Sequence, residues 1–266
     1  IEDNLTGQEA KIFSISNLQF PISSLKPVEQ IPTPPFYGNK VVENISLDEV
    51  FKYVNDAALI RGQWQVRKGK MSNEDYQKLL DEKIYPEYET LKLKVKNEKL
   101  LEPKVAYGYF QCQSEVNDLL IYSNSKSQIP NLKFSFPRQR DDRYLCLSDF
   151  FASKESEKFD VIGMMLVTMG KRASEYSQQL FESNNYKDYL YFHGLSVECA
   201  EALAELWHKK MREELGIASD DAKEIKKLFS QGYRGARYSF GYPACPNLED
   251  QTKLFSLLQP ERIGVE

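Results

Sequence analysis

The longest helical pattern in the chain runs from about Tyr186 to Leu215. Apolar residues recur there at intervals of three and four and form one stripe, made of Phe192, Cys199, Leu203, Trp207, Met211 and Leu215. The opposite face carries charged residues, which are Glu198, Glu201, Glu205, Lys209 and Arg212. This spacing predicts an amphipathic helix with one face in the core and one in solvent, and Gly216 predicts its end.

Three other segments show helical spacing. Residues 46–55 begin with Ser46 three positions before Glu49, the order of a capping box. Residues 72–101 begin with Ser72, and Pro86 marks a break or a new first turn within them. A further helix is predicted over residues 220–229, before a glycine-rich loop.

Strand patterns occupy the middle of the chain. Residues 105–112 and 118–122 are rich in β-branched and aromatic side chains and predict a hairpin, which residues 132–136 continue. Residues 161–169 predict one more strand. Because strands and helices come in clusters rather than in strict alternation, the class is α+β, a largely antiparallel sheet with helices around it. The first 36 residues end in a proline run, so we expect an extended arm or interdomain connection over 1–36 and one domain over 37–266.

Composition narrows the possible functions. The 266 residues include 39 acidic and 35 basic ones, interleaved, with a net charge of −4, which gives no support to a nucleic-acid surface. No apolar run approaches the roughly 20 residues of a membrane span, and the N-terminus lacks a signal layout. We therefore expect a cytoplasmic protein with no membrane partner. The four cysteines lie far apart and only two histidines are present, so we expect no metal site.

Candidate chemistry concentrates in residues 232–247. Glycines at 232, 235 and 241 and prolines at 243 and 246 constrain the backbone, so the loop suits close contact with a heterocyclic ligand. Arg237 suits a carboxylate, and Tyr242 suits a ring or a cation. The same residues also fit a packed surface turn with Arg237 in a structural ion pair, and on composition alone this second interpretation is favoured.

A resemblance to a known family favours the ligand-binding interpretation of this loop over the structural one. The order Arg237-x-x-x-Gly241-Tyr242, continued by Pro-Ala-Cys-Pro, resembles the signature of the S-adenosylmethionine-binding activation domain of cobalamin-dependent methionine synthase. Residues 41–43 and 53–55, residues 144–150, and residues 195–205 with His208 agree with that family in the same order. The resemblance extends from about Pro34 to the end of the sequence, and several separated motifs are more specific than one.

The resemblance implies a C-shaped single domain built on a twisted, mostly antiparallel sheet flanked by helices. It also implies a role in methionine biosynthesis: the domain holds S-adenosylmethionine over oxidised cob(II)alamin, which another domain carries, while flavodoxin or an equivalent reductase supplies an electron. The enzyme as a whole is a 5-methyltetrahydrofolate–homocysteine methyltransferase. This domain contributes a ligand site and no catalytic residue of its own.

Site residues follow from the matched positions. The resemblance implies that Arg237 binds the ligand carboxylate, that the backbone at Tyr238 and Ser239 contacts the adenine, and that Gly241 and Tyr242 shape the wall. Many relatives read Arg-Pro-Ala-Pro-Gly-Tyr where this chain reads Arg-Tyr-Ser-Phe-Gly-Tyr, so a contact at Ser239 requires main-chain atoms.

Three further positions carry acidic or amide groups. Asn55 stands where well-known members have aspartate, and Asp56 follows it, so the ligand ammonium group is expected to meet one of these two side chains. Glu201 matches an acidic position near the ligand. The family's later Pro-x-x-Ser-x-Ser-Gly motif is absent, so we expect residues 37–266 to lack the C-terminal end of the domain.

Other functions remain as alternatives. One is a free-standing corrinoid-reactivation protein that acts on a separate partner, although Ile1 and the proline-rich arm favour a piece of a longer chain. Another is a hydrolase with Cys245 as nucleophile, for which no nearby base is found in the sequence. Arg138, Arg140 and Arg143 are expected to form a solvated loop or a docking patch for an acidic reductase.

Overall fold

The structure is a computed structural model. It describes residue 25 and residues 30–123, 129–140, 143–230, 232–233 and 235–266. Most of the expected arm at 1–36 lies outside these ranges. Within the described part of that segment, Phe36 packs edge-on against Tyr107 and Tyr109, with ring centroids 5.6 and 5.2 Å apart.

An antiparallel sheet forms the centre of the molecule. Its strands are β1 (Gly38–Val42), β2 (Lys104–Glu115), β3 (Asp118–Tyr122), β4 (Leu132–Ser135) and β5 (Asp160–Thr168). The long strand β2 pairs with β5 along one edge, and with β1 and then β3 along the other, and β4 adds to β3. The predicted hairpin, its continuation and the strand at 161–169 are therefore confirmed.

Alternate residues of β2 serve two separate cores. Val105, Tyr107 and Tyr109 belong to the core that contains the apolar stripe of α5 (Tyr186–Glu214), whereas Ala106 and Phe110 belong to a smaller core beside α7 (Asp250–Leu258). A strand buried on both faces explains why residues 105–112 read as a nearly continuous apolar run.

Helices surround this sheet. Besides α5 and α7 they are α1 (Leu47–Phe51), α2 (Asn73–Leu79), α3 (Tyr85–Asn97), α4 (Lys171–Glu182) and α6 (Ile225–Leu228). The short helical segments are η2 (Ala58–Gln63), η3 (Leu80–Ile84), η4 (Leu147–Phe150), η5 (Lys154–Ser156) and η6 (Pro260–Ile263). Ser72 caps α2, since its Oγ accepts the Asp75 N–H at 3.0 Å, whereas Ser46 precedes α1 without a side-chain cap.

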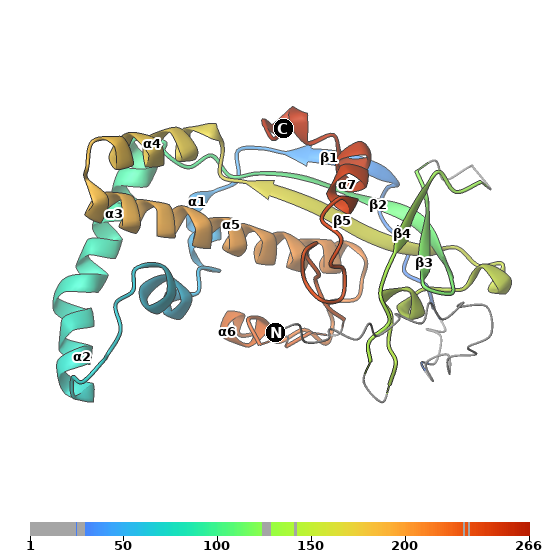
Figure 1. Cartoon of the computed structure of the whole chain (residues 1–266), viewed down its shortest axis with the longest axis horizontal. Coiled ribbons are helices and arrows are strands. Elements are labelled where there is room, and N and C mark those ends of the chain that lie inside the picture. The colour runs from blue at the N-terminus through green and yellow to red at the C-terminus, as the bar shows by residue number, and fades with distance from the viewer. Residues whose placement is uncertain (1–24, 26–29, 124–128, 141–142, 231, 234) are drawn as a thin grey trace, which may run out of the picture.

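The elements are arranged as an arch. Figure 1 shows α2 and α3 at one end, β3 and β4 at the other, and α5 with the sheet between them, while α6 lies on the concave side. The C-shaped α+β fold is thus confirmed. The helix expected over 220–229 is mostly wrong, because only Ile225–Leu228 is helical.

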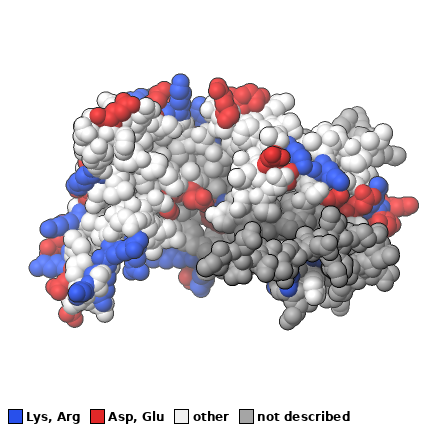
Figure 2. Space-filling view, in the orientation of Figure 1, with Lys and Arg blue, Asp and Glu red and all other residues white. Residues whose placement is uncertain are grey.

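The polar face of α5 also differs from the expectation. Glu198, Glu205 and Arg212 are buried, with exposed fractions of 8%, 8% and 4%, so this face is not simply solvated. The segment at residues 55–64 and the loop after residue 218 pack against it. Figure 2 shows acidic side chains next to a recess in the middle of this face, over α5.

Candidate ligand-binding site

The loop that follows α6 is shaped by its own backbone. The Gly241 N–H donates to the Cys245 carbonyl and the Cys245 N–H donates to the Tyr242 carbonyl, both at 2.9 Å. Gly241 has φ of +96°, and a Cβ at this position would lie 2.9 Å from Cδ2 of Leu248. The positive φ favours glycine whatever the space, and the end of the Leu248 side chain would also have to shift for a larger residue, which accounts for this position of the motif.

Arg237 lies between this loop and α5. Its Nη2 is 3.5 Å from Oε2 of Glu201 and 3.6 Å from Oε2 of Glu205, which are long distances for a charged pair. Its Nε is buried and has no hydrogen-bond partner among the described residues. A buried N–H without an acceptor is costly, so the described residues use the hydrogen-bonding capacity of this guanidinium only in part.

Two aromatic side chains extend outward from the loop. Tyr238 and Tyr242 are 52% and 66% exposed, which is unusual for rings of this size. Phe240 between them turns inward and stacks with Phe134, with centroids 5.8 Å apart. The carbonyl of Ser239 accepts the Cys245 thiol at 3.0 Å. The loop is thus anchored at Phe240 and Cys245 and presents Tyr238 and Tyr242 to the outside.

Asn55 and Asp56 stand at the start of the helical turn that continues into η2. Oδ1 of Asn55 accepts the N–H groups of Ala57 and Ala58, each at 3.2 Å, so this side chain acts as a helix cap. Asp56 lies at the surface, and the pKa of its carboxyl is raised because the surrounding protein removes part of its solvation. Lys92 and Lys226 act in the opposite direction.

The far end of η2 contacts the acidic face of α5. Gln63 donates to Oε1 of Glu198 at 3.2 Å, three residues before Glu201. Gly194 makes this approach possible, since a Cβ there would lie 2.8 Å from Cβ of Gln63. Burial raises the pKa of the Glu198 carboxyl, Gln63 opposes that rise, and Glu201 adds to it. Arg237 and Glu201 are brought together, whereas no ion pair joins Asp56 to Arg237 among the residues described.

Two residues of the cluster around Arg237 were not expected from the sequence. Glu205 contacts Arg237, and Nδ1 of His208 lies 3.9 Å from Oε1 of Glu205. His208 in turn packs edge-on against Tyr233, with centroids 4.8 Å apart. Glu205 and His208 follow Glu201 by four and seven positions, so helical spacing from Glu201 was the available signal.

Cys245 and Arg138 have other roles than those considered. The Cys245 thiol is buried and donates to a carbonyl, and burial raises its pKa, so the thiolate that a nucleophile needs is disfavoured. Arg138 is not in a solvated loop: it forms a two-point pair with Asp149 at 2.7 and 2.9 Å, both side chains being largely buried. Residues 141–142 lie outside the described residues.

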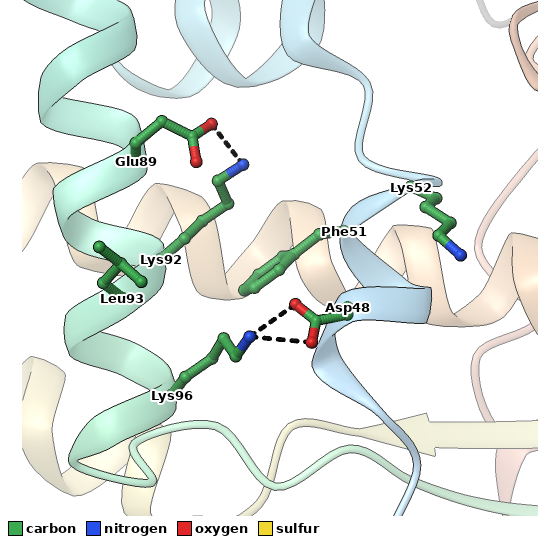
Figure 3. A pocket seen from close by; sticks show the side chains of 7 residues that line it. All are labelled: Asp48, Phe51, Lys52, Glu89, Lys92, Leu93 and Lys96. Atoms are coloured by element: carbon green, nitrogen blue, oxygen red, sulfur yellow. Dashed lines mark hydrogen bonds and ion pairs between the residues drawn. The ribbon is translucent and has the colours of Figure 1, made fainter.

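Two hollows in the surface lie away from this cluster. One, of about 310 Å³, lies between α1 and α3, where Lys96 pairs with Asp48 and Lys92 with Glu89, with Phe51 between the two lysines (Figure 3). Lys52 also lines this hollow, and two of its three lysines are paired with carboxylates. The other, of about 590 Å³, is an uncharged groove between α4 and α5. Neither is lined by a residue expected from the resemblance.

The part of the chain that the structure describes meets neither the requirements of a metal-ion cluster nor those of a membrane-spanning helix. No cluster there combines three or more histidine, cysteine, aspartate or glutamate side chains in a way that would hold a metal ion. No described helix has both the length and the apolar character needed to cross a bilayer.

Comparison with known proteins identifies the family. The family model of the activation domain of vitamin B12-dependent methionine synthase matches residues 46–266. The chain belongs to this family. The activation domain is 39% identical over 250 residues to methionine synthase of Mycobacterium tuberculosis (strain ATCC 25618 / H37Rv), and 37% identical over 249 residues to that of Mycobacterium leprae (strain TN). Each match covers 89% of this chain and 21% of the relative, so the chain spans about a fifth of their length.

A solved structure shares the fold. The crystal structure of a MetH reactivation domain bound to AdoHcy matches with a TM-score of 0.78 at 23% identity. The match covers 94% of this chain and 77% of that one. The fold that the resemblance implies is therefore the fold observed.

Proposed function

We propose that this chain, over residues 37–266, is the activation module of a cobalamin-dependent methionine synthase and that it binds S-adenosylmethionine beside Arg237. The observation that carries the proposal is the incomplete pairing of Arg237, whose buried Nε has no partner among the described residues and whose Nη2 has only long contacts. The solved relative with AdoHcy and the two longer methionine synthases support it.

The amino-acid part of the ligand would lie between two charges. Arg237 binds the carboxylate, since its planar fork matches two carboxylate oxygens. Asp56 binds the ammonium group, because the Asn55 oxygen already caps a helical turn and its amide carries no charge. Glu201, which is 67% exposed, is a second carboxylate near the proposed ligand and lies 3.5 Å from Arg237.

The adenine would lie against the loop. Tyr238 and Tyr242 offer exposed rings, and Gly241 keeps the backbone open to close approach. The carbonyl of Ser239 already accepts the Cys245 thiol, so the N–H of Ser239 is the main-chain group that we assign to the base.

The chemistry belongs to the ligand and to a cobalamin that another domain holds. That cobalamin would accept the methyl group of the bound S-adenosylmethionine, with S-adenosylhomocysteine as the leaving group, once flavodoxin or an equivalent reductase had supplied one electron. The residues of this chain bind and orient the ligand. We further expect a cytoplasmic site of action, without nucleic acid or membrane.

The test combines the chain with a cobalamin-carrying fragment of the same enzyme. Corrin spectra are expected to show methylcobalamin only when S-adenosylmethionine and an electron donor are both present. Arg237→Ala is expected to slow its formation, whereas Arg172→Ala, at an exposed position of α4, is the matched control. Equal methylation without S-adenosylmethionine would reveal another methyl source and refute the proposal.

A further inference from the structure

Glu205 differs from Glu201 although both contact the same atom of Arg237. The Glu205 side chain is 11% exposed and the Glu201 side chain 67% exposed, while their distances to Nη2 are 3.6 and 3.5 Å. An exposed ion pair contributes little, since solvent and salt screen it. Nη2 is within hydrogen-bond distance of Glu201 alone, but the charge of the buried Glu205 carboxylate is screened less by solvent, so Glu205 attracts the guanidinium more strongly from the protein side.

Glu205 is itself held in place. It projects from the middle of α5, the 29-residue helix that packs on the sheet. Its other oxygen lies 3.9 Å from Nδ1 of His208, and that ring packs against Tyr233. Burial raises the pKa of Tyr233, and the charge of Glu205 raises it further while that of Arg237 lowers it, as expected if both charges lie beside this ring. The backbone of α5 therefore fixes where the Glu205 carboxylate projects, while the buried Nδ1 of His208 lies near it without a hydrogen bond among the described residues.

We propose that Glu205 is a positioning residue, which fixes the guanidinium of Arg237 so that the ligand carboxylate meets a preorganised fork. This inference rests on the proposed function. A long arginine side chain loses considerable conformational freedom when a ligand immobilises it. A carboxylate that already restrains it from the protein side reduces that loss, at the cost of some repulsion toward the ligand carboxylate. Because Glu205 leaves the buried Nε without a partner, that edge remains for the ligand.

The experiment uses the whole chain and two ligands that differ only in the carboxylate, S-adenosylmethionine and decarboxylated S-adenosylmethionine. Glu205→Gln keeps the shape of the side chain and removes its charge. We expect it to weaken S-adenosylmethionine binding about fivefold to tenfold, the effect of one newly immobilised side chain, and to leave the decarboxylated ligand unchanged. Glu213→Gln, an exposed position near the end of the same helix, is the matched control.

A double variant distinguishes a positioning role of Glu205, which acts through Arg237, from a general effect on the stability of the protein. In an Arg237→Ala background, Glu205→Gln is expected to have no further effect on either ligand. Should Glu205→Gln fail to fold, Glu205→Asp, which keeps the charge but shortens the reach, is expected to weaken S-adenosylmethionine alone. Unchanged or tighter binding of S-adenosylmethionine, or an equal loss for both ligands, would overturn the inference. If Arg237→Ala itself leaves binding intact, the proposed site is wrong as well.

Discussion

Arg138 and Arg237 both face carboxylates, but protein acceptors satisfy the hydrogen-bond donors of the two guanidinium groups to different degrees. Arg138 donates to both oxygens of Asp149 at 2.7 and 2.9 Å, to Asn117 Oδ1 from Nε and Nη2, and to the Tyr144 carbonyl. Arg237 has two contacts at 3.5 and 3.6 Å, both from Nη2, and a buried Nε with no described partner.

The difference indicates what each arginine does. Arg138 has each of its nitrogens matched by protein acceptors, and the Asp149 carboxylate raises the pKa of its guanidinium. Arg212 is similar, since its Nε donates to Asp221 at 2.8 Å and its Nη2 pairs with the other oxygen. Such saturated pairs stabilise the fold, whereas Arg237 has an Nε without a described partner, the group that we propose for the ligand.

Arg138→Ala gives the largest expected change. It leaves Asp149 buried without its main cation, so we expect the free energy of unfolding to fall by about 3 kcal/mol. Urea denaturation measures this, with Arg140→Ala as the control on the same loop. Ligand affinity of the folded fraction should stay unchanged. A free energy of unfolding close to that of the unaltered chain would show that the Arg138–Asp149 pair does not stabilise the fold.

Asp221→Asn tests the second saturated pair, with an expected loss of about 2 kcal/mol at neutral pH. The hydrogen bond from Arg212 lowers the pKa of Asp221 in the folded state. The pair therefore stabilises the fold above the unfolded pKa of about 4, and this contribution disappears as the pH falls through the lower folded value. Urea midpoints between pH 6 and about pH 3 should decline less in the variant. Parallel declines would show that the pair does not contribute.

Arg237→Lys should affect binding rather than stability. An ammonium keeps the charge but cannot make two parallel hydrogen bonds, so we expect S-adenosylhomocysteine to bind about tenfold more weakly. The urea midpoint should move little, since the contacts of Arg237 are long. A large stability loss with unchanged affinity would place Arg237 with the structural arginines.

Cys245→Ser gives the smallest expected effect. A serine hydroxyl also donates to the Ser239 carbonyl, so affinity should stay within about twofold. Calorimetry of the variant measures this. A complete loss of methylcobalamin formation with binding intact would instead return Cys245 to consideration as a reactive residue.

Much of the fold could be predicted from the sequence, because the periodic patterns of apolar residues that indicate helices and strands are local. The stripe from Phe192 to Met211 and the strands at 105–112 and 161–169 follow simple periods, and the structure confirms all three. Helix α4 and strand β1 were not predicted. Helix α4 begins at Gly170 without a side-chain cap, and β1 is five residues long and depends on its pairing with β2.

The candidate site could be predicted only in part from the sequence. The motif around Arg237 and Glu201 could be recognised, but the burial of Glu205 and Arg212 could not, because it depends on residues distant in sequence, such as Gln63, Asp221 and Arg237, that pack against α5. Helical periodicity assigns both residues to the polar face and contains no information about what covers that face. The cap made by Asn55 is likewise a matter of backbone geometry, which its identity alone does not determine.

The most direct test of the account is calorimetry of S-adenosylhomocysteine with the unaltered chain and with Arg237→Ala, beside urea denaturation of both. We expect measurable binding that the substitution weakens by about 2–3 kcal/mol, as for a charge-assisted contact in a partly desolvated site, while stability changes by about 1 kcal/mol or less. Equal affinity of the two proteins for S-adenosylhomocysteine would contradict the assignment of Arg237 to the ligand.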